Sequence, residues 1–180
     1  SIMFTWDATR VWIERAAYTL NNFPLILDDT KRCKNHKMLG QVLYDFASGH
    51  GRGRGSIQGM QTTMNWKTIL LSTGEQPITT FTEDGGTRSR AICIWNPNGP
   101  FGDVSAETAQ FVNQLNSDVL HNYGTAGRQF LDWFLTHHDH WEEFKTEFYR
   151  QRKHYIERAG NNAIASRMAA YFAVIDIAAA

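Results

Sequence analysis

The sequence contains few cysteines, no net charge and no long hydrophobic run, and each of these absences excludes a class of protein. Two cysteines, Cys33 and Cys93, are too few for a disulfide-stapled fold, so we expect a reduced, cytoplasmic chain. Eighteen basic and eighteen acidic residues cancel, which excludes a uniformly basic nucleic-acid coat or polybasic membrane binder. No apolar run approaches the roughly 20 residues that cross a bilayer, so no membrane partner is expected.

The residues that are present are sufficient for a folded core. The chain has 180 residues, of which 42% are hydrophobic and 13% aromatic, enough for one compact domain or one domain with a small appendage. It starts without an initiator Met, and it stops within an apolar helical pattern that ends at Ala180. We therefore expect a piece of a larger protein, with a complete small domain as the alternative.

The first hundred residues alternate between helical and strand-like patterns. Short apolar runs with polar ends are typical of strands buried on both faces of a parallel sheet, whereas apolar residues three and four apart indicate helices. The segment 78–82 is ambiguous between a short helix and a strand. The predicted helices are 9–20 and 35–48, with Gly49 as the C-terminal cap, and the predicted strands are 25–27, 67–72 and 91–95.

The last eighty residues have helical spacing throughout. Phe111, Leu115 and Val119 form one stripe, and the segments 130–155 and 164–175 form two more. The aromatic series from Trp133 to Tyr149 fits core packing better than base stacking. We thus predict an α/β region over residues 1–102, with a partial parallel sheet of about three strands, followed by an all-helical region over 103–180.

Two adjacent acids follow the first predicted strand. In LILDD, Asp28 and Asp29 come directly after Leu25–Leu27, at the carboxyl edge of the predicted sheet, where ligands bind in open α/β folds. One carboxylate there can hold Mg²⁺ while its neighbour polarises a water, which is the Walker B arrangement of phosphate-hydrolysing ATPases. The alternative is an ordinary strand that ends in an acidic turn.

Polar side chains also adjoin the other two predicted strands. Ser72 and Thr73 end the second strand and would lie beside the acids if the two strands are parallel and adjacent. Arg88 and Arg90 precede the third strand, and an arginine donated across a subunit interface can accelerate phosphoryl transfer by about 10³–10⁵. An ordinary strand-to-turn transition and a surface arginine are the respective alternatives.

The order of these features is that of an AAA+-type ATPase core after its P-loop. The blocks FPLILDDTKR, SGHGRGRGS, WKTILLSTGE and GGTRSRAICI together resemble a bacterial and phage family catalogued as domain-of-unknown-function family nine-two-seven. Its members are similar to the helicase-like ATPases of phages and mobile elements, MCM-like replicative helicases included. The resemblance therefore implies an AAA+/RecA-like fold with a helical, lid-like C-terminal region, in a DNA helicase or translocase that forms a homo-oligomeric ring.

The resemblance also implies roles for individual residues of the motor. The acids match the Walker B pair, with Asp28 as the metal ligand, and a polar residue of the second strand matches the first sensor. An arginine before the third strand matches the arginine finger, and one on the last helix matches a second sensor. Asp28 and Asp29 are thus the Walker B pair, and Thr73 or Ser72 is the first sensor. Arg90, with Arg88 as the alternative, is the arginine finger, and Arg167 is the second sensor.

One motif of such a motor is missing from the sequence. No G-x-x-x-x-G-K-[ST] occurs, and GHGRGRGS has the wrong spacing and no lysine, so it is not a phosphate-binding loop. The cofactors ATP and Mg²⁺ are accordingly expected in the full-length parent, whose P-loop would precede this chain. The fragment alone is predicted to be inactive.

One stretch of the neutral chain is strongly basic. A Gly-rich segment, Gly49–Ser56, lies in it, and in the helicases that the chain resembles a hairpin at this place grips DNA. We expect phosphate-directed contacts to DNA, most of all single-stranded DNA, with a mobile loop kept soluble by arginines as the alternative. The cations expected at the DNA are Lys31, Arg32, Arg52 and Arg54.

Three other functions compete with the motor. A nucleic-acid-binding module without ATPase activity would need only the basic stretch. A metal-dependent phosphodiesterase would use Asp28 and Asp29, but the sequence offers no obvious third ligand. A zinc site at His137, His140 and Glu143 lacks a second ligand cluster.

Overall fold

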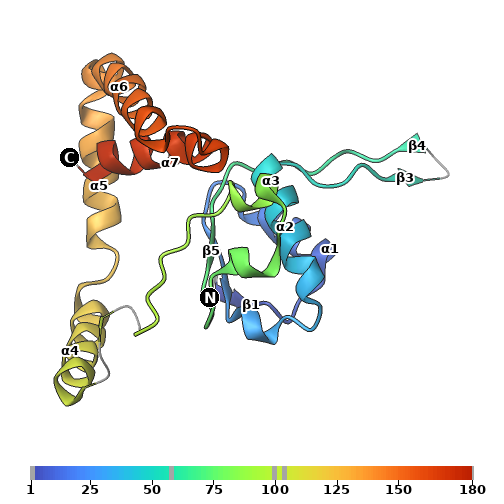
Figure 1. Cartoon of the computed structure of the whole chain (residues 1–180), viewed down its shortest axis with the longest axis horizontal. Helices are drawn as coiled ribbons and strands as arrows, with labels where there is room; N and C mark the ends of the chain where they lie inside the picture. The colour runs from blue at the N-terminus through green and yellow to red at the C-terminus, as the bar shows by residue number, and fades with distance from the viewer. Residues whose placement is uncertain (1–2, 57–58, 99–100, 103–104, 180) are drawn as a thin grey trace. The chain divides into compact units, whose positions relative to one another are not determined.

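The computed structural model describes residues 3–56, 59–98, 101–102 and 105–179 (Figure 1). The chain divides into two compact units, residues 1–94 and 95–180. The first unit is α/β and the second is helical, which confirms the predicted fold class. The boundary predicted between residues 102 and 103 stays a prediction, since Asp103 lies outside the described residues.

A three-stranded parallel sheet forms the centre of the first unit. Its strands are β1 (Met3–Thr5), β2 (Leu25–Asp28) and β5 (Leu70–Ser72), in the order β1-β2-β5. Leu27 pairs with Phe4 on one side and with Ser72 on the other. The two strands predicted at 25–27 and within 67–72 are therefore confirmed as adjacent and parallel.

Two helices pack on this sheet and bury its core. α1 (Arg10–Leu20) begins after Thr9, whose hydroxyl accepts a hydrogen bond from the Trp12 amide. α2 (His36–Ser48) ends at Gly49, where a φ of +74° favours glycine. The buried core comprises Trp6, Ile13, Ala17, Leu25, Leu27, Cys33, Leu39, Val42, Phe46 and Trp66.

The prediction of a third strand at residues 91–95 is wrong. Residues 91–95 have no strand structure, and Ile92 and Ile94 are exposed rather than buried. The segment lacks a partner strand among the described residues, and the third place in the sheet belongs to β1, which the sequence pattern did not indicate. The ambiguous segment 78–82 forms a 3-10 turn, η2 (Ile78–Phe81), and α3 (Gly85–Arg88) follows it.

The Gly-rich segment forms one arm of an antiparallel ribbon, which we call the glycine–arginine ribbon (residues 49–56 and 59–66). Its strands are β3 (Gly55–Ser56) and β4 (Gly59–Met60), and the same register continues to the base, where the Trp66 amide donates to the Gly49 carbonyl. The ribbon projects from the body of the first unit (Figure 1). It lies immediately before β5 in the chain, at the place where the family resemblance implied a hairpin.

The second unit consists of helices. α6 and α7 pack together, burying Ala169 and Ala173, and the Tyr155 hydroxyl donates to Asp176 at 2.5 Å. Four aromatic side chains of α5 and α6 contact one another: Trp133, Phe134, Trp141 and Phe144. Its elements are α4 (Ala106–Asn122), α5 (Thr125–Thr136), η3 (His138–His140), α6 (Trp141–Ala159) and α7 (Ala163–Ala179).

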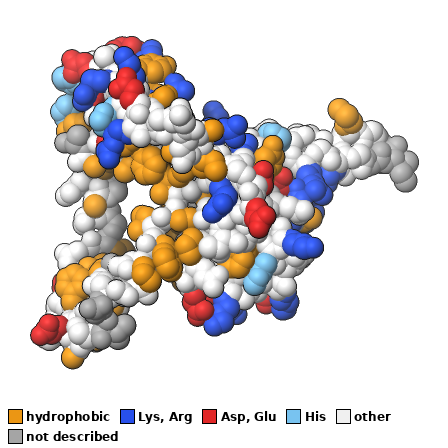
Figure 2. Space-filling view, viewed as in Figure 1, with side chains coloured by type: hydrophobic (Ala, Val, Ile, Leu, Met, Phe, Trp, Pro, Cys, Tyr) orange, Lys and Arg blue, Asp and Glu red, His pale blue; other side chains and the backbone are white. Residues whose placement is uncertain are grey.

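The surface of both units carries exposed hydrophobic side chains (Figure 2). In the first unit these include Ile69, Leu71, Ile92 and Ile94. None of the described helices is both long and apolar enough to cross a membrane.

Candidate functional site

The carboxyl edge of the sheet brings together the acids and one hydroxyl of the predicted motor site. The Thr73 hydroxyl donates to Asp28 Oδ1 at 2.5 Å, and it accepts a hydrogen bond from the Asp29 amide at 2.9 Å. A single hydroxyl thus joins the ends of β2 and β5. The geometry follows from the parallel pairing, since the carboxyl ends of neighbouring parallel strands lie at the same edge.

Asp29 occupies an unusual backbone conformation at this edge. Its φ is +59°, a region that non-glycine residues seldom adopt. Its carboxylate accepts a hydrogen bond from the Lys31 amide and so caps η1 (Thr30–Arg32), while the Thr30 amide donates to the Thr73 carbonyl. Both acids are half-buried, so each retains access to solvent.

The two hydroxyl residues at the end of β5 have different surroundings. Ser72 Oγ accepts a hydrogen bond from the Trp6 indole at 2.9 Å, and Trp6 is fully buried. Thr73 bonds to the acids instead. Sequence reasoning left Thr73 or Ser72 open as the sensor. Of the two, Thr73 has its hydroxyl against the acids, and the sensor role stays a prediction.

The basic residues of η1 lie at the acidic edge and not on the ribbon. Lys31 Nζ lies 3.1 Å from Glu75 Oε1, in a pair that is about 70% exposed on both sides. Arg32 is exposed. The 13 residues of α2 separate η1 from the ribbon, which is about 20 Å of helix. The basic stretch therefore forms two separate groups of cations.

The predicted finger arginines lie on and after α3, which packs against α2. Arg90 donates to the Gly86 carbonyl, and its guanidinium carbon lies 4.3 Å from the centre of the Tyr44 ring. Arg88 is exposed, with no ion pair or hydrogen bond from its side chain among the described residues. Arg90 is therefore held by contacts within its own unit, whereas the Arg88 side chain is exposed.

Arg167 lies on α7 and its side chain is exposed. It belongs to the helical unit, whereas the acids belong to the α/β unit. Its role as a second sensor stays a prediction.

No group of three or more His, Cys, Asp or Glu side chains gathers as a metal site in the described part of the chain. The phosphodiesterase and zinc hypotheses consequently gain no support. His140 Nδ1 instead lies 2.8 Å from Glu143 Oε2. A Mg²⁺ ion in a nucleotide site needs less, because one or two carboxylates and the substrate phosphates hold it.

The two arginines of the ribbon differ in their contacts. Arg54 Nη2 lies 2.6 Å from Glu14 Oε2, and Glu14 is buried on α1. Arg52 is exposed and has no ion pair with any described residue. Of the cations predicted at DNA, Arg52 is therefore the ribbon residue that is available to a phosphate.

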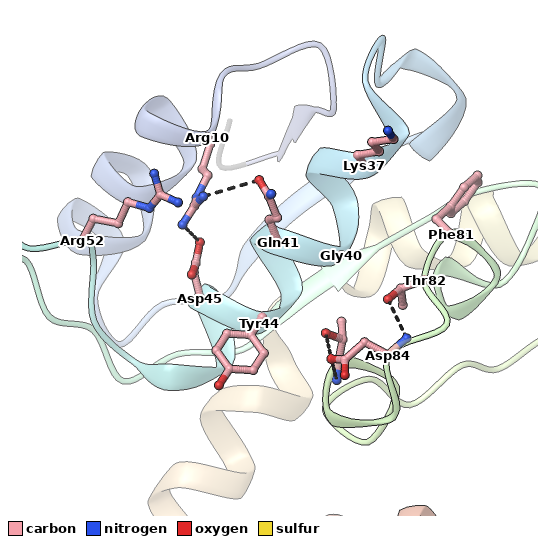
Figure 3. A pocket seen from close by; sticks show the side chains of 11 residues that line it. Arg10, Lys37, Gly40, Gln41, Tyr44, Asp45, Arg52, Phe81, Thr82 and Asp84 are labelled. Carbon is pink, nitrogen blue, oxygen red and sulfur yellow. Dashed lines mark hydrogen bonds and ion pairs between the residues drawn. The ribbon is translucent and has the colours of Figure 1, made fainter.

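Sequence reasoning missed the polar network at the base of the ribbon. Arg10 forms an ion pair with Asp45 and a hydrogen bond with Gln41, and Arg52 lies beside it (Figure 3). These residues line an open cavity of about 420 Å³. Across the cavity, hydrogen bonds from the Thr87 hydroxyl and amide lower the pKa of Asp84. The signal in the sequence that could have indicated this network is Glu14. It is an acid on the apolar face of α1, where a carboxylate needs a basic partner, and Arg10 is one such partner.

The comparisons with known proteins bear on the family resemblance and on the fold. Residues 1–66 match the family described as "Domain of unknown function (DUF927)". This DUF927 match confirms the predicted resemblance and contains two of the four blocks that carried it, FPLILDDTKR and SGHGRGRGS. The other two blocks lie beyond it, apart from Trp66, the first residue of WKTILLSTGE.

A solved structure supports the fold over the whole chain. It is described as "SCCmec type IV Cch - active helicase", and its TM-score with this chain is 0.67 at 24% sequence identity. The similarity covers 99% of this chain and 31% of that one. This chain thus shares the fold of about a third of a helicase structure. No curated protein matches the sequence.

Proposed function

We propose that this chain is part of an ATP-dependent DNA helicase or translocase of a phage or mobile element and supplies its Walker B, sensor and arginine-finger residues. The observation that carries the proposal is the hydrogen bond of Thr73 to Asp28 at the carboxyl edge of a parallel sheet. The similarity to a structure described as an active helicase supports the same class. The P-loop comes from another part of a longer protein.

In this proposal each residue at the acidic edge has one task. Asp28 would hold Mg²⁺, and the ion would supply positive charge that neutralises the phosphates of ATP. Asp29 accepts a proton from the attacking water, and its capped, strained position holds the carboxylate in place. Thr73 orients both acids through its hydroxyl. Arg88 or Arg90 acts on the nucleotide of a neighbouring subunit in the ring, and Arg167 acts as a second sensor.

In this proposal the DNA-binding surface is the ribbon, which follows the C-terminal end of α2, whereas the acidic edge precedes the N-terminal end of α2. Arg52 on the projecting ribbon meets the phosphates of single-stranded DNA without reading its sequence. Lys31 and Arg32 add charge at the acidic edge, where Lys31 already pairs with Glu75.

The test is ATP turnover of a longer protein that contains this chain and an upstream P-loop, with and without single-stranded DNA. We expect Asp29→Asn to lower kcat by about 10² or more, and Arg88→Ala or Arg90→Ala by up to about 10³–10⁵. Glu83→Gln, an exposed acid of the same unit, serves as the matched control and should retain wild-type turnover.

A nucleic-acid-binding module without ATPase activity is the second candidate, and the projecting ribbon favours it. If DNA binds but a protein with an intact P-loop does not hydrolyse ATP, this second function replaces the first. Wild-type turnover in Asp29→Asn would also contradict the motor assignment.

A further inference from the structure

We propose that Glu14 is a positioning residue for the glycine–arginine ribbon. Its buried carboxylate holds Arg54, which fixes the base of the ribbon and leaves Arg52 to meet the phosphates. This inference rests on the proposed DNA-binding role of the ribbon and assigns different tasks to the two arginines of its Gly-rich segment, Arg52 and Arg54.

The burial of Glu14 is the first argument. The side chain is 4% exposed and lies on the face of α1 that also buries Ile13 and Ala17. A carboxylate on such a face is costly unless it is paired. Its Oε2 lies 2.6 Å from Arg54 Nη2, and its Oε1 lies 3.8 Å from Arg10 Nε. Arg54 is the closer partner, and it comes from a different element.

The base of the ribbon is the second argument. The backbone passes so close to the carboxylate that a Cβ at Gly51 would lie 3.5 Å from Glu14 Oε2. Farther out, a Cβ at Gly53 or Gly55 would meet no atom within 4 Å. Packing therefore orients the ribbon only near its base. The ion pair of Arg54 reaches beyond that base and restrains the arm that carries Arg52.

The sign of the electrostatic effect separates this role from a simple phosphate contact. Replacing Glu14 with Gln removes a negative charge, which by itself strengthens the attraction of DNA. If Glu14 positions the ribbon, the same replacement weakens DNA binding because the ribbon loses its orientation. The two roles therefore predict opposite changes in affinity.

The first arm of the experiment measures the ribbon without DNA, by hydrogen exchange of residues 51–64 in the whole 180-residue chain. The reporters are the amides of Gly51 and Gln61, which donate to Met64 and Arg54 across the ribbon. We expect Glu14→Gln and Arg54→Ala to speed the exchange of these amides at least about tenfold, because each variant loses a charged hydrogen bond. Arg52→Ala and Glu83→Gln should leave exchange unchanged. Unchanged exchange in Glu14→Gln and Arg54→Ala would overturn the anchor.

The second arm measures fluorescence anisotropy of a labelled oligothymidine at several salt concentrations. Glu14→Gln should weaken binding severalfold without changing the salt dependence, because it removes no phosphate contact. Arg52→Ala should lower the slope of log K against log salt by about 0.7. Tighter binding by Glu14→Gln, with unchanged ribbon exchange, would identify Arg54 as a phosphate contact and overturn the inference.

Folding controls keep the exchange and the DNA-binding measurements interpretable. Arg54→Ala leaves Glu14 paired with Arg10, and it carries the same exchange test if Glu14→Gln does not fold. Glu14→Asp retains the charge and should restore part of the protection. If the wild-type chain does not bind the oligonucleotide, the DNA-binding role fails, while the exchange arm still decides whether Glu14 anchors the ribbon.

Discussion

At the scale of single residues, the hydroxyls of Ser72, the last residue of β5, and of Thr73, which follows it, make different contacts because successive side chains of an extended chain point in opposite directions. The exposed Ser72 accepts the indole hydrogen of the buried Trp6, whereas Thr73 meets the acids at the edge. The first contact serves stability, and the second serves the proposed chemistry. Exchanging the two residues' tasks would require a one-residue shift of the strand.

We expect Ser72→Ala to lower the free energy of unfolding by about 1–3 kcal/mol, because the buried indole N–H of Trp6 loses its acceptor. Chemical denaturation followed by tryptophan fluorescence measures the change. Thr73→Ala should instead lower ATP turnover in a longer protein with a P-loop. Equal effects of the two variants on stability and turnover would contradict this division.

Residue-level reasoning from the sequence predicted that the acids and a hydroxyl, of Thr73 or Ser72, meet at one sheet edge, since those residue types follow recognisable strand ends, and the contact of Thr73 with Asp28 confirms the meeting. The roles of these residues and of the ribbon arginines stay predictions. It did not predict the pairing of Glu14 with Arg54, because 40 residues separate them and no local pattern links them. Nor did it show that Arg90 rests on Tyr44. Such contacts depend on how elements pack.

At the scale of elements, amphipathic spacing predicted α1 and α2 well, whereas η3 breaks the segment 130–155, which was expected as one helical stretch, between α5 and α6. α1 and α2 match their expected ranges, and Gly49 ends α2 as predicted. Apolar runs predicted strands less well. Residues 91–95 have the composition of a strand but no partner among the described residues, and β1 forms from only Met3–Thr5 by pairing with β2. Strand formation depends on a neighbour that the local sequence does not contain.

The junction of η3 and α6 should give the helical unit a measurable pH dependence. A hydrogen bond with Glu143, and the charge of Asp139, raise the pKa of His140 above its usual 6.5. The contribution of the charged pair to stability is therefore complete below about pH 6.5 and is lost as the pH rises through the higher folded-state pKa.

We expect the melting temperature, followed by far-UV circular dichroism, to fall over that pH range in the wild type and to change less in Glu143→Gln. His138→Ala, a neighbour in η3, is the control and should retain the wild-type pH dependence. A pH profile of Glu143→Gln identical to the wild type would show that the pair does not contribute.

At the scale of the whole molecule, the open edge of β5 connects the fold with the proposed function. Among the described residues β5 is the last strand in the order β1-β2-β5. Ile69, which precedes it, and Leu71, which lies within it, are 60% and 46% exposed. Parallel sheets normally bury both faces and leave few apolar edges. Residues 91–94 provide a second exposed apolar segment, with Ile94 98% exposed. The chain also spans only 31% of the helicase structure that it matches.

A strand from a longer protein, inserted beside β5, would cover this edge, and under the proposed function it is the strand that precedes the P-loop. We then expect amide exchange at 70–72 and 91–94 to be slower by orders of magnitude in the longer protein than in the 180-residue chain, because new cross-strand hydrogen bonds protect these amides. Amides of β2, already paired on both sides, serve as the control and should change little. Equally fast exchange in both proteins would contradict the insertion. Protection that increases with the concentration of the 180-residue chain would indicate instead that a second copy covers the edge.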